Sequence, residues 1–514
     1  MQMGIISSNP ANTEGENVIV WLDSGPTAYT NFGIVSALSK IDEFNLIGIV
    51  STKQDISFFQ NQQITPFQAL LYYPDCYIGK TTFDLNNLKK IEEKFDLNIW
   101  LDIFTERSFY KYWTEFHKFT KDEILAIIYH TISFFVDTIE TYKPKLILAK
   151  QVGDNVSSLL LYRVAKKMGV KILMPNQLYL KNKITISDNL VSREISDEFK
   201  KSINGFTNSA KTYDEEFIKN YDRSESVSLL LQGSNLRKSL SQRINHYIKR
   251  LSTELEPVYQ NIGKTKFKMI KYRLHNYLEA KKRKQFLDDN SIKSVGNEKF
   301  LYFPLASEPE ARIMTTSPFY TNQITLVENI AKSIPIDSVL YVKEHPVQKL
   351  KLWRSITDYK KIINIPNVKF IHPSVSNHEL LSKCQGVIAI SGGTGFEAIF
   401  YKKPVILFAD EYYDVLSMVT KIKKLTTLPN DVADALSNFQ FNNNELAAFM
   451  QAFDKQSLSV PYHLIRNDAY VLSNMQLYVH DFHLTTKEFH KFYETFEKYF
   501  ELIAQTIHSK LNNI

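Results

Sequence analysis

Short apolar runs alternate with longer amphipathic segments along most of this chain. From residue 17 on, four such runs lie at 18–23, 46–51, 145–150 and 170–175. Segments with helical spacing lie between them, the longest at 121–142. Continuous apolar strands that alternate with helices are typical of a parallel sheet with helices on both faces. The pattern predicts a Rossmann-like N-terminal domain over 17–205.

The same alternation starts again near residue 297. Five further strands are predicted at 299–305, 339–346, 368–373, 386–391 and 403–409. They indicate a second Rossmann-like domain over 297–480. The expected fold class is therefore α/β, with two Rossmann-like domains facing a cleft. In open parallel sheets, ligands bind at the carboxyl ends of the strands.

Three further segments complete the predicted organisation. The first, 1–16, lacks apolar periodicity, and we expect a disordered tail. The second, 206–296, is interpreted as a basic helical insertion or linker. The third, 481–514, carries aromatic residues at helical spacing and begins with a capping-box pattern from Thr485 to Glu488. It predicts an amphipathic C-terminal helix that packs on a domain.

Length and composition agree with an intracellular protein of two domains. The chain of 514 residues exceeds what one hydrophobic core usually supports. Its two cysteines, Cys76 and Cys384, form no CxxC motif, so neither a disulfide framework nor a structural zinc site is supported. No uncharged apolar run approaches ~20 residues, and no signal-peptide pattern begins the chain. We expect a cytoplasmic protein that is neither secreted through a signal peptide nor membrane-spanning.

The formal net charge of +7 comes from one segment. Residues 237–300 contain 16 Lys and Arg against 6 Asp and Glu, with apolar side chains interleaved at helical spacing. Such a segment fits an anionic membrane surface, where each nearby cation contributes ~1 kcal/mol. It fits equally a polyanionic glycan, or a linker whose apolar face packs on a domain. Nucleic acid is not an expected partner, because no nucleic-acid-binding motif accompanies the charge.

A glycine turn between a strand and a helix is the first candidate for ligand chemistry. The strand at 386–391 runs into the turn Ser391, Gly392, Gly393, Thr394 and Gly395. Glycines let the backbone approach an anion, which free amides and the helix dipole then stabilise. Glu397, near the start of the helix, could accept hydrogen bonds from a ribose diol. The alternative is a tight connection in which Glu397 serves only the helix dipole.

The sequence LYVKEHP supplies a second candidate at the end of another predicted strand. Strand alternation sends Lys343 and His345 to one side and Glu344 to the other. Both motifs end strands of the same domain, so we expect them at the same edge. A lysine and a histidine around one phosphate can neutralise the charge on a departing nucleotide, a task that other enzymes give to a metal. The alternative is an ordinary surface edge with a solvated lysine.

Metal and P-loop chemistry lack support in the sequence. There is no Asp-x-Asp after a strand, no HExxH and no G-x-x-x-x-G-K-[ST] motif. The 12 histidines show no close ligand spacing. We therefore expect no divalent metal and no cofactor, with a nucleotide substrate bound directly by the protein.

Three stretches carry a family resemblance: FPLASEPEA at 303–311, LYVKEHP at 340–346 and SGGTGFEAIFYKKPVILF at 391–408. In order and spacing they resemble the capsule polysaccharide biosynthesis proteins and related surface-carbohydrate glycosyltransferases, over about residues 297–425. The resemblance implies the two-Rossmann GT-B architecture. The His-Pro motif is also similar to the nucleotide-phosphate contact of Kdo transferases and bacterial sialyltransferases, which use cytidine donors. Several of those carry paired Ser or Thr residues where this chain has SGGTG, so CMP- and UDP-linked donors both stay open.

The resemblance implies a metal-independent, inverting glycosyltransferase with its nucleotide-sugar donor on the C-terminal domain. The acceptor, a surface polysaccharide or lipid-linked glycan, and the general base would belong to the N-terminal domain. Asp154, in a glycine turn after the strand at 145–150, is the first choice, although it could equally cap the next helix. Asp23, at the end of the strand at 18–23, is the reserve. Attachment to the inner membrane face is an open addition to the cytoplasmic location.

Three more side chains are candidates for the donor side. Glu308 and Glu310 in FPLASEPEA would bind sugar hydroxyls, or would be solvated acids in a proline-rich turn. His372, at the end of the strand at 368–373, would lie near the nucleotide base.

Two other functions fit the same pattern. One is a nucleotide-sugar epimerase on the double-Rossmann scaffold, which would need no acceptor. The other is a non-catalytic nucleotide-binding subunit of a capsule assembly complex. Fold alone does not decide among them, because function resides in the site.

Overall fold

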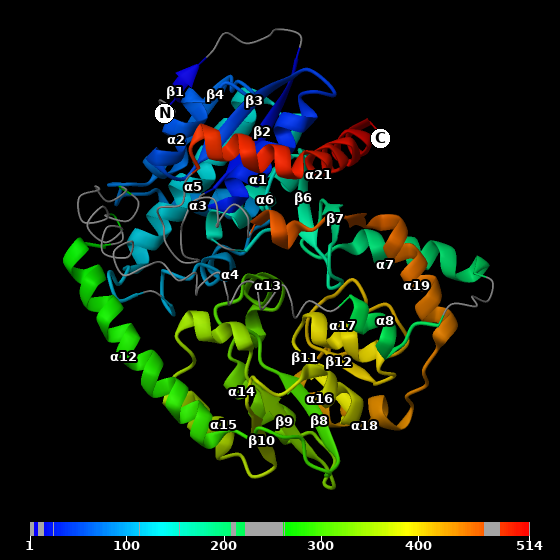
Figure 1. Cartoon of the computed structure of the whole chain (residues 1–514). Coiled ribbons are helices and arrows are strands. Elements are labelled where there is room, and N and C mark those ends of the chain that lie inside the picture. Colours follow the sequence, from blue (N-terminus) through cyan, green and yellow to red (C-terminus); the bar gives the residue numbers. More distant parts are fainter. Residues whose placement is uncertain are drawn as a thin grey trace. The chain divides into compact units, whose positions relative to one another are not determined.

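The computed structural model describes residues 5–8, 15–23, 25–112, 114–153, 155–206, 212–221, 257, 261, 263–466 and 484–512 (Figure 1). The chain divides into two compact units. The first contains Met1–Gln177, Leu229–Tyr272 and Leu458–Ile514, and the second contains Leu178–Ser228 and Arg273–Ser457. Each unit is built around a largely parallel sheet.

Six strands of the first unit's sheet run in the order β1-β4-β3-β2-β5-β6. Their bounds are Ile5–Ser8 (β1), Glu16–Leu22 (β2), Phe44–Val50 (β3), Ala69–Tyr72 (β4), Leu146–Leu148 (β5) and Lys171–Gln177 (β6). Neighbours from β4 to β6 pair in parallel, while β1 pairs antiparallel with β4. The last five residues of both β2 and β3 are buried, as a sheet covered on both faces requires.

The helices of the first unit follow its strands along the chain. Their bounds are Pro26–Leu38 (α1), Lys53–Asn61 (α2), Tyr73–Cys76 (η1), Leu85–Phe95 (α3), Ile99–Ile103 (α4), Lys121–Tyr142 (α5), Val156–Lys167 (α6) and Thr486–Asn512 (α21). Within the described ranges, α5 is the one helix long and apolar enough to cross a membrane, and 67% of its apolar window is buried. It packs against α6 and η1 as a core helix of this unit.

The C-terminal helix α21 packs across α1 (Figure 1). The predicted capping box is present: the Thr485 amide donates to Glu488 at 2.7 Å, and the Glu488 amide donates to the Thr485 hydroxyl at 3.3 Å. The predicted amphipathic helix is therefore confirmed. Between the sheet and α21, α1 is buried on nearly all sides, which explains why its sequence shows no amphipathic pattern.

Six parallel strands form the sheet of the second unit, in the order β10-β9-β8-β11-β12-β13. Their bounds are Phe300–Pro304 (β8), Val339–Lys343 (β9), Val368–Ile371 (β10), Gly386–Ala389 (β11), Val405–Leu407 (β12) and Val419–Lys421 (β13). Two short strands complete the list of described strands, Lys183–Ser187 (β7) and Leu458–Ser459 (β14). All five strands predicted for the C-terminal domain are present within two or three residues of their expected ends.

Helices cover both faces of the second sheet. Their bounds are Arg193–Ser202 (α7), Ile203–Gly205 (η2), Glu215–Asn220 (α8), Ala311–Thr316 (α13), Pro318–Tyr320 (η3), Gln323–Ala331 (α14), Pro346–Lys351 (η4), Ile356–Ile363 (α15), Asn377–Lys383 (α16), Gly393–Phe400 (α17), Leu425–Thr427 (η5), Leu428–Ser437 (α18) and Asn443–Gln456 (α19). Side chains on the two sides of the strands form separate apolar clusters. The predicted α/β class with two Rossmann-like sheets is confirmed.

The chain divides differently from the predicted domain boundaries. Residues 178–206 belong to the second unit, where Tyr179 and Phe199 join the apolar cluster around Phe396. Part of the expected N-terminal tail, Ile5–Ser8, forms the edge strand β1. About half of the basic insertion, including all of 222–256, lies outside the described residues; its described helices are α8 and the long helix Lys266–Asn290 (α12), in which the unit boundary falls.

The close approach of α1 and α21 generates a stability prediction. A Cβ atom added to Gly33 would lie 2.8 Å from two carbons of the fully buried Phe500 ring, so Gly33→Val should force the helices apart. We expect a loss of about 1–3 kcal/mol in the free energy of unfolding, measured in urea. Gly205→Val, where nothing lies within 4 Å, is the control. Equal stability of both variants would contradict the tight α1–α21 packing.

Candidate functional site

The sheet order of the second unit brings the two sequence motifs to one edge. β8 lies between β9 and β11, and all three strands are parallel. Their carboxyl ends therefore face the same side, and neighbouring strands lie ~4.8 Å apart. The end of β9, with Lys343, is thus roughly 10 Å from the end of β11, where the glycine turn begins. A lysine side chain and one phosphate group can span that separation.

Lys343 is a buried cation at this edge. It ends β9, pairs with Pro304 of β8 and Ile371 of β10, and is only 7% exposed. Across the described part of the chain, no hydrogen bond or ion pair to its ammonium group occurs. Burial lowers the pKa of Lys343 to about 8, against the opposing effect of the nearby Glu397 carboxylate. A buried ammonium without a protein partner is costly, so the position is typical of a site that receives an anion.

The next side chain, Glu344, points to the opposite side, as strand alternation predicts. It is fully buried and accepts hydrogen bonds from Arg354 Nε at 3.0 Å and from the Tyr359 hydroxyl at 2.9 Å. Burial raises the pKa of Glu344, and Arg354 acts in the opposite direction. Glu344 is therefore a structural residue that fixes the loop after β9.

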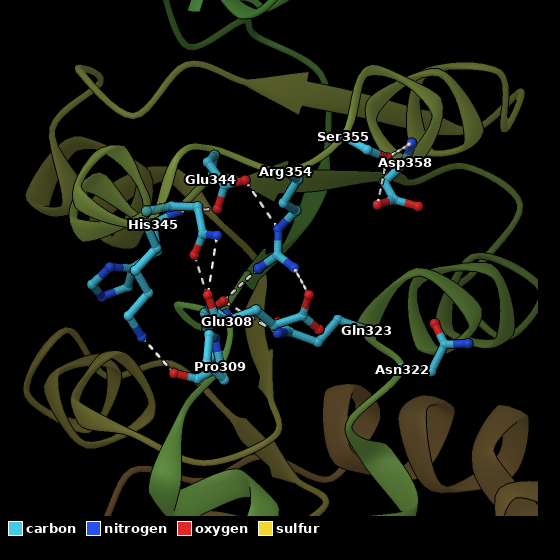
Figure 2. Close-up of polar contacts among 12 residues, drawn as sticks. Glu308, Pro309, Asn322, Gln323, Glu344, His345, Arg354, Ser355 and Asp358 are labelled. Atoms are coloured by element: carbon cyan, nitrogen blue, oxygen red, sulfur yellow. Dashed lines mark hydrogen bonds and ion pairs between the residues drawn. The ribbon is translucent and has the colours of Figure 1, made fainter. Parts of the chain in front are cut away.

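Arg354 joins this loop to the one that follows β8. Figure 2 shows its guanidinium between the carboxylates of Glu344 and Glu308, 2.7 Å from Glu308 Oε2. Gln348 completes the junction, accepting from the Glu308 amide at 2.8 Å and donating to the Glu308 carbonyl at 3.2 Å. The carboxylate that the sequence offered as a sugar ligand is thus held in an ion pair. Glu310 precedes α13 and forms no side-chain cap of that helix.

His345 caps the short helix η4. Its Nδ1 accepts a hydrogen bond from the Val347 amide at 3.2 Å. Because that amide can only donate, a neutral imidazole carries its proton on Nε2. In Figure 2 the ring points away from the Glu344–Arg354 pair. His345 is half-buried.

The glycine turn opens α17 at the same edge. Gly392 is the N-cap residue with a φ of 107°, a conformation that favours glycine, and no side chain caps the helix. A Cβ atom at Gly392 would meet nothing within 4 Å. The first amides of a helix have no intrahelical partner, so those of Gly393 and Thr394 are available to an anion. Ser391 and Thr394 are half-buried beside them.

Gly395 has a packing role within the predicted cradle. It is buried, and a Cβ atom there would lie 2.6 Å from the Tyr413 hydroxyl. That hydroxyl donates to the Gly392 carbonyl at 2.9 Å, and this hydrogen bond stabilises the conformation of the turn. The three glycines therefore have different roles. Gly392 adopts a backbone conformation that favours glycine, Gly393 offers an accessible amide, and Gly395 allows close packing against Tyr413.

Glu397 lies between the turn and Lys343. The Asn377 amide donates to Glu397 Oε2 at 2.7 Å, and the Tyr302 hydroxyl donates to Asn377 Oδ1 at 2.8 Å. This chain of bonds orients the carboxylate from the middle of β8 and the start of α16. The sequence analysis missed Asn377 and Tyr302, because neither belongs to a recognised motif.

Glu411 is a third residue at this edge that was not predicted from the sequence. It is fully buried after β12 and accepts from the Gly392 amide at 3.0 Å, from the Tyr179 hydroxyl at 2.6 Å and from Arg312 Nη2 at 3.0 Å. The Arg312 guanidinium lies 5.1 Å from the centre of the Tyr179 ring. Glu411 thus uses the first amide of the turn and leaves the following ones to a ligand. The sequence signal that could have identified Glu411 is its position shortly after an apolar strand of the same sheet.

His372 lies at the end of β10. Its Nε2 is 3.0 Å from Asp288 Oδ1, and its Nδ1 contacts the Ser374 hydroxyl at 2.5 Å. Both ring nitrogens therefore have protein partners. A contact with a nucleotide base would require stacking on the ring or replacement of one of these bonds.

In the first unit, Asp23 follows β2 and is held by protein groups. It is 6% exposed, forms an ion pair with the equally buried Lys150 and accepts from Asn155 Nδ2 at 3.2 Å. Asn155 is the N-cap of α6, and its side chain accepts from the Ser158 amide at 3.0 Å. Asp154 itself lies outside the described residues.

The start of α6 already holds a carboxylate of the protein. Glu106 Oε2 accepts from the Val156 amide at 3.0 Å, and Glu106 Oε1 accepts from Ser108. An internal acid thus occupies the position that an anion would take in this unit. The corresponding turn of the second unit keeps its Gly393 and Thr394 amides available. This difference favours the second unit as the anion-binding one.

Within the part of the chain that the structure describes, no group of three or more His, Cys, Asp or Glu could hold a metal ion. The charged and polar groups that the structure describes at the edge of the second sheet are the Lys343 ammonium, the His345 imidazole and the backbone amides at the start of α17. Together they can hold a phosphate or diphosphate and stabilise charge that develops on it.

A family model for capsule polysaccharide biosynthesis proteins matches residues 223–438. This stretch contains the end of β9 and the glycine turn, and the match confirms the family resemblance over that part of the chain. No curated protein matches the chain by sequence.

Several solved structures are distantly similar. The KpsC beta Kdo 2,7 transferase of Thermosulfurimonas dismutans is 13% identical, over 62% of this chain and 79% of that chain, with a TM-score of 0.32. The UDP-GlcNAc 2-epimerase of Methanocaldococcus jannaschii is 13% identical, over 83% and 95%, with a TM-score of 0.25. A glycosyltransferase of Rickettsia africae is 10% identical, over 89% and 98%, with a TM-score of 0.27. Function is therefore inferred from the geometry of the site and from the family match.

The buried ion pair behind the site generates a prediction. Arg354→Met leaves Glu344 buried without its cation, and we expect a loss of about 3–5 kcal/mol in the free energy of unfolding. Without Arg354 the pKa of Glu344 rises further, so the folded state binds a proton more tightly than the unfolded state. The loss should therefore shrink as the pH falls from about 8 to about 5.

The control for this prediction is Lys299→Met, which removes an exposed ion pair with Asp337. Exposed pairs contribute roughly 0–1 kcal/mol. Urea unfolding at several pH values measures both variants. A loss for Arg354→Met no larger than that of the control would show that the Glu344–Arg354 pair does not fix this loop.

Proposed function

We propose that this protein is a metal-independent, inverting glycosyltransferase that transfers a sugar from a CMP- or UDP-linked donor to a surface polysaccharide or glycolipid. The match to the capsule polysaccharide biosynthesis family supports a role in that pathway. Donor, acceptor and mechanism are the proposal. It depends above all on the buried ammonium of Lys343 at the edge that also carries the glycine turn.

The donor's phosphates would lie between Lys343, His345 and the start of α17. Lys343 supplies a charge in a site with little water, where an ion pair is stronger than in solution. His345 Nε2–H and the amides of Gly393 and Thr394 supply hydrogen bonds to the phosphate oxygens. Ser391 and Thr394 add hydroxyl donors. These groups take the part that a divalent cation has in other transferases.

The reaction needs charge stabilisation on the nucleotide and a base for the acceptor. The acceptor oxygen forms a bond to the anomeric carbon, the bond from that carbon to the donor phosphate oxygen breaks, and the electron pair stays on the phosphate. Lys343 and His345 stabilise that pair. The hydroxyl proton goes to a carboxylate, and direct displacement inverts the anomeric centre.

Glu397 would accept hydrogen bonds from the ribose hydroxyls. Its orientation by Asn377 supports this role, because one carboxylate oxygen is fixed while Oε1 lies toward the turn, 3.6 Å from the Cβ position of Gly393. Glu310 and His372 are proposed to contact the sugar and the base, respectively. The ion pair of Glu308 with Arg354 favours a supporting position for that residue.

We propose Asp154 as the general base, with Asp23 as the alternative. The buried ion pair of Asp23 with Lys150 makes it the weaker candidate, because its carboxylate is already bound within the protein. We place the protein in the cytoplasm, where nucleotide sugars are available.

Two other activities would give different products. An epimerase would convert the nucleotide sugar without an acceptor, and a non-catalytic subunit would bind nucleotide without turnover.

A thermal-shift screen with CMP, CDP, UDP and GDP tests the donor site. A nucleotide at ~100 times its Kd should add ~2.7 kcal/mol of stability, seen as a higher Tm. Lys343→Met and His345→Ala should each weaken binding by about 10- to 100-fold, since each removes a charged or polar partner of the phosphate. Lys349→Met, which changes an exposed lysine in η4, is the matched control.

The pH dependence of binding separates Lys343 from other cations. The ammonium form binds the phosphate, and burial lowers the pKa of Lys343 to about 8, so affinity should fall about fivefold between pH 8 and pH 9. Lys343→Met should abolish that decline. No stabilisation by any of the four nucleotides, or equal binding by Lys343→Met and the control, would contradict the proposed donor site.

The choice of base has its own test. Asp154→Asn should lower kcat by about 10²- to 10⁴-fold and leave nucleotide affinity unchanged, because the base acts on the acceptor. Asp23→Asn, measured in parallel with a nucleotide sugar and a capsule-derived acceptor, distinguishes the alternative. Full activity of both variants would exclude both carboxylates. Conversion of the nucleotide sugar in the absence of acceptor would favour the epimerase instead.

A further inference from the structure

The long helix α12 is oriented by contacts at its C-terminal end. Arg283 donates to the Trp353 carbonyl at 3.1 Å, Phe286 stacks on Tyr359 at 6.3 Å, and Leu287 is 1% exposed. Leu287 is the only residue of this 25-residue helix that is buried. One face of α12 therefore packs on the second unit, and the opposite face lies in solvent.

The solvent face of α12 is apolar. Its large exposed side chains are Phe267 (77%), Ile270 (51%), Leu274 (63%), Tyr277 (63%) and Leu278 (50%). At ~100° per residue these five fall within an arc of about 100°. The centre of that arc is about 130° away from Leu287. We call these five residues the outer stripe.

The position of the outer stripe reverses the usual pattern of a surface helix. Such helices bury their apolar stripe against the core and present polar residues to water. Single exposed apolar residues are common, but a contiguous row of five large ones marks a surface that binds something.

Basic residues flank the outer stripe on both sides. Residues 266–284 contain eight Lys and Arg and a single acid, Glu279. By helical spacing, Lys271 and Lys282 lie along one side of the stripe, and Lys266 and Lys284 along the other. Ion pairs of Lys282 with Glu279 and of Lys284 with Asp288 are exposed and contribute little in water.

We propose that α12 lies in the headgroup region of an anionic lipid bilayer, with the outer stripe inserted among the acyl chains and the flanking cations at the lipid phosphates. This arrangement matches both features at once: apolar area is removed from water, and the cations meet anionic headgroups. The inference does not depend on the nucleotide site. It would place the protein where a lipid-linked acceptor is found.

Other binding partners would account for the cations or for the apolar side chains of this surface, but not for both. A polyanionic glycan or nucleic acid would neutralise the cations but leave five apolar side chains in water. A second copy of this chain, related by two-fold symmetry, would bring two rows of like charges together. A bilayer with acidic headgroups satisfies the apolar and the charged parts together.

Flotation with vesicles tests the proposal on the full chain. We expect binding to phosphatidylcholine vesicles that contain about 30% phosphatidylglycerol, and binding at least about tenfold weaker to vesicles of phosphatidylcholine alone. The double variant Ile270→Glu and Leu274→Glu should lose at least about tenfold in affinity for the anionic vesicles. The matched control is Phe319→Glu and Ile336→Glu, which changes two side chains that are 85% and 105% exposed elsewhere in the second unit.

A fluorescent reporter follows insertion directly. Tyr277→Trp should show a blue shift and protection from a water-soluble quencher when anionic vesicles are added. Tight vesicle binding by the Ile270→Glu and Leu274→Glu variant would overturn the proposal and assign the attraction to charge alone. So would binding to heparin with no binding to vesicles, or a monomer–dimer equilibrium that the variant abolishes without any effect of lipid.

Discussion

The parallel register of β9, β8 and β11 is the constraint on which the candidate site depends. It brings the ends of β9 and β11 to one edge with a single strand between them, so a lysine from one motif and a helix N-terminus from the other can share an anion. The same register places Lys343 between two neighbouring strands, which removes water from it. Burial of the cation and its position opposite the glycine turn therefore have one structural cause.

Three of the acids around this edge are bound to arginine side chains of the protein. Glu344 and Glu308 are bound to Arg354, and Glu411 is bound to Arg312 and to the first amide of the turn. Each carboxylate is thus neutralised within the protein and does not repel a phosphate. Glu397 accepts a hydrogen bond from the Asn377 amide, which orients its carboxylate.

Much of the fold and the core of this site could be predicted from the sequence. Strands that are apolar throughout identify a parallel sheet, and the strand-end rule then places Lys343, His345 and the glycine turn together. Glu411, Asn377 and Tyr302 were missed because their roles depend on which strands are neighbours, and short apolar runs do not encode strand order. The boundary at Gln177 was missed for a related reason: Tyr179 and Phe199 join the apolar cluster of the second unit through aromatic packing, which has no local signature. The role of Glu308 changed because its partner Arg354 is 46 residues away in the sequence.

The central claim is that Lys343 and the start of α17 bind one phosphate group. The most direct measurement is a crystal structure of the protein with bound CMP or UDP. The account predicts a phosphate oxygen within hydrogen-bonding distance of Lys343 Nζ and another within reach of the Gly393 or Thr394 amide, with His345 Nε2 on the same group. An ordered nucleotide whose phosphates lie elsewhere, with the Lys343 ammonium still lacking an anionic partner, would contradict it.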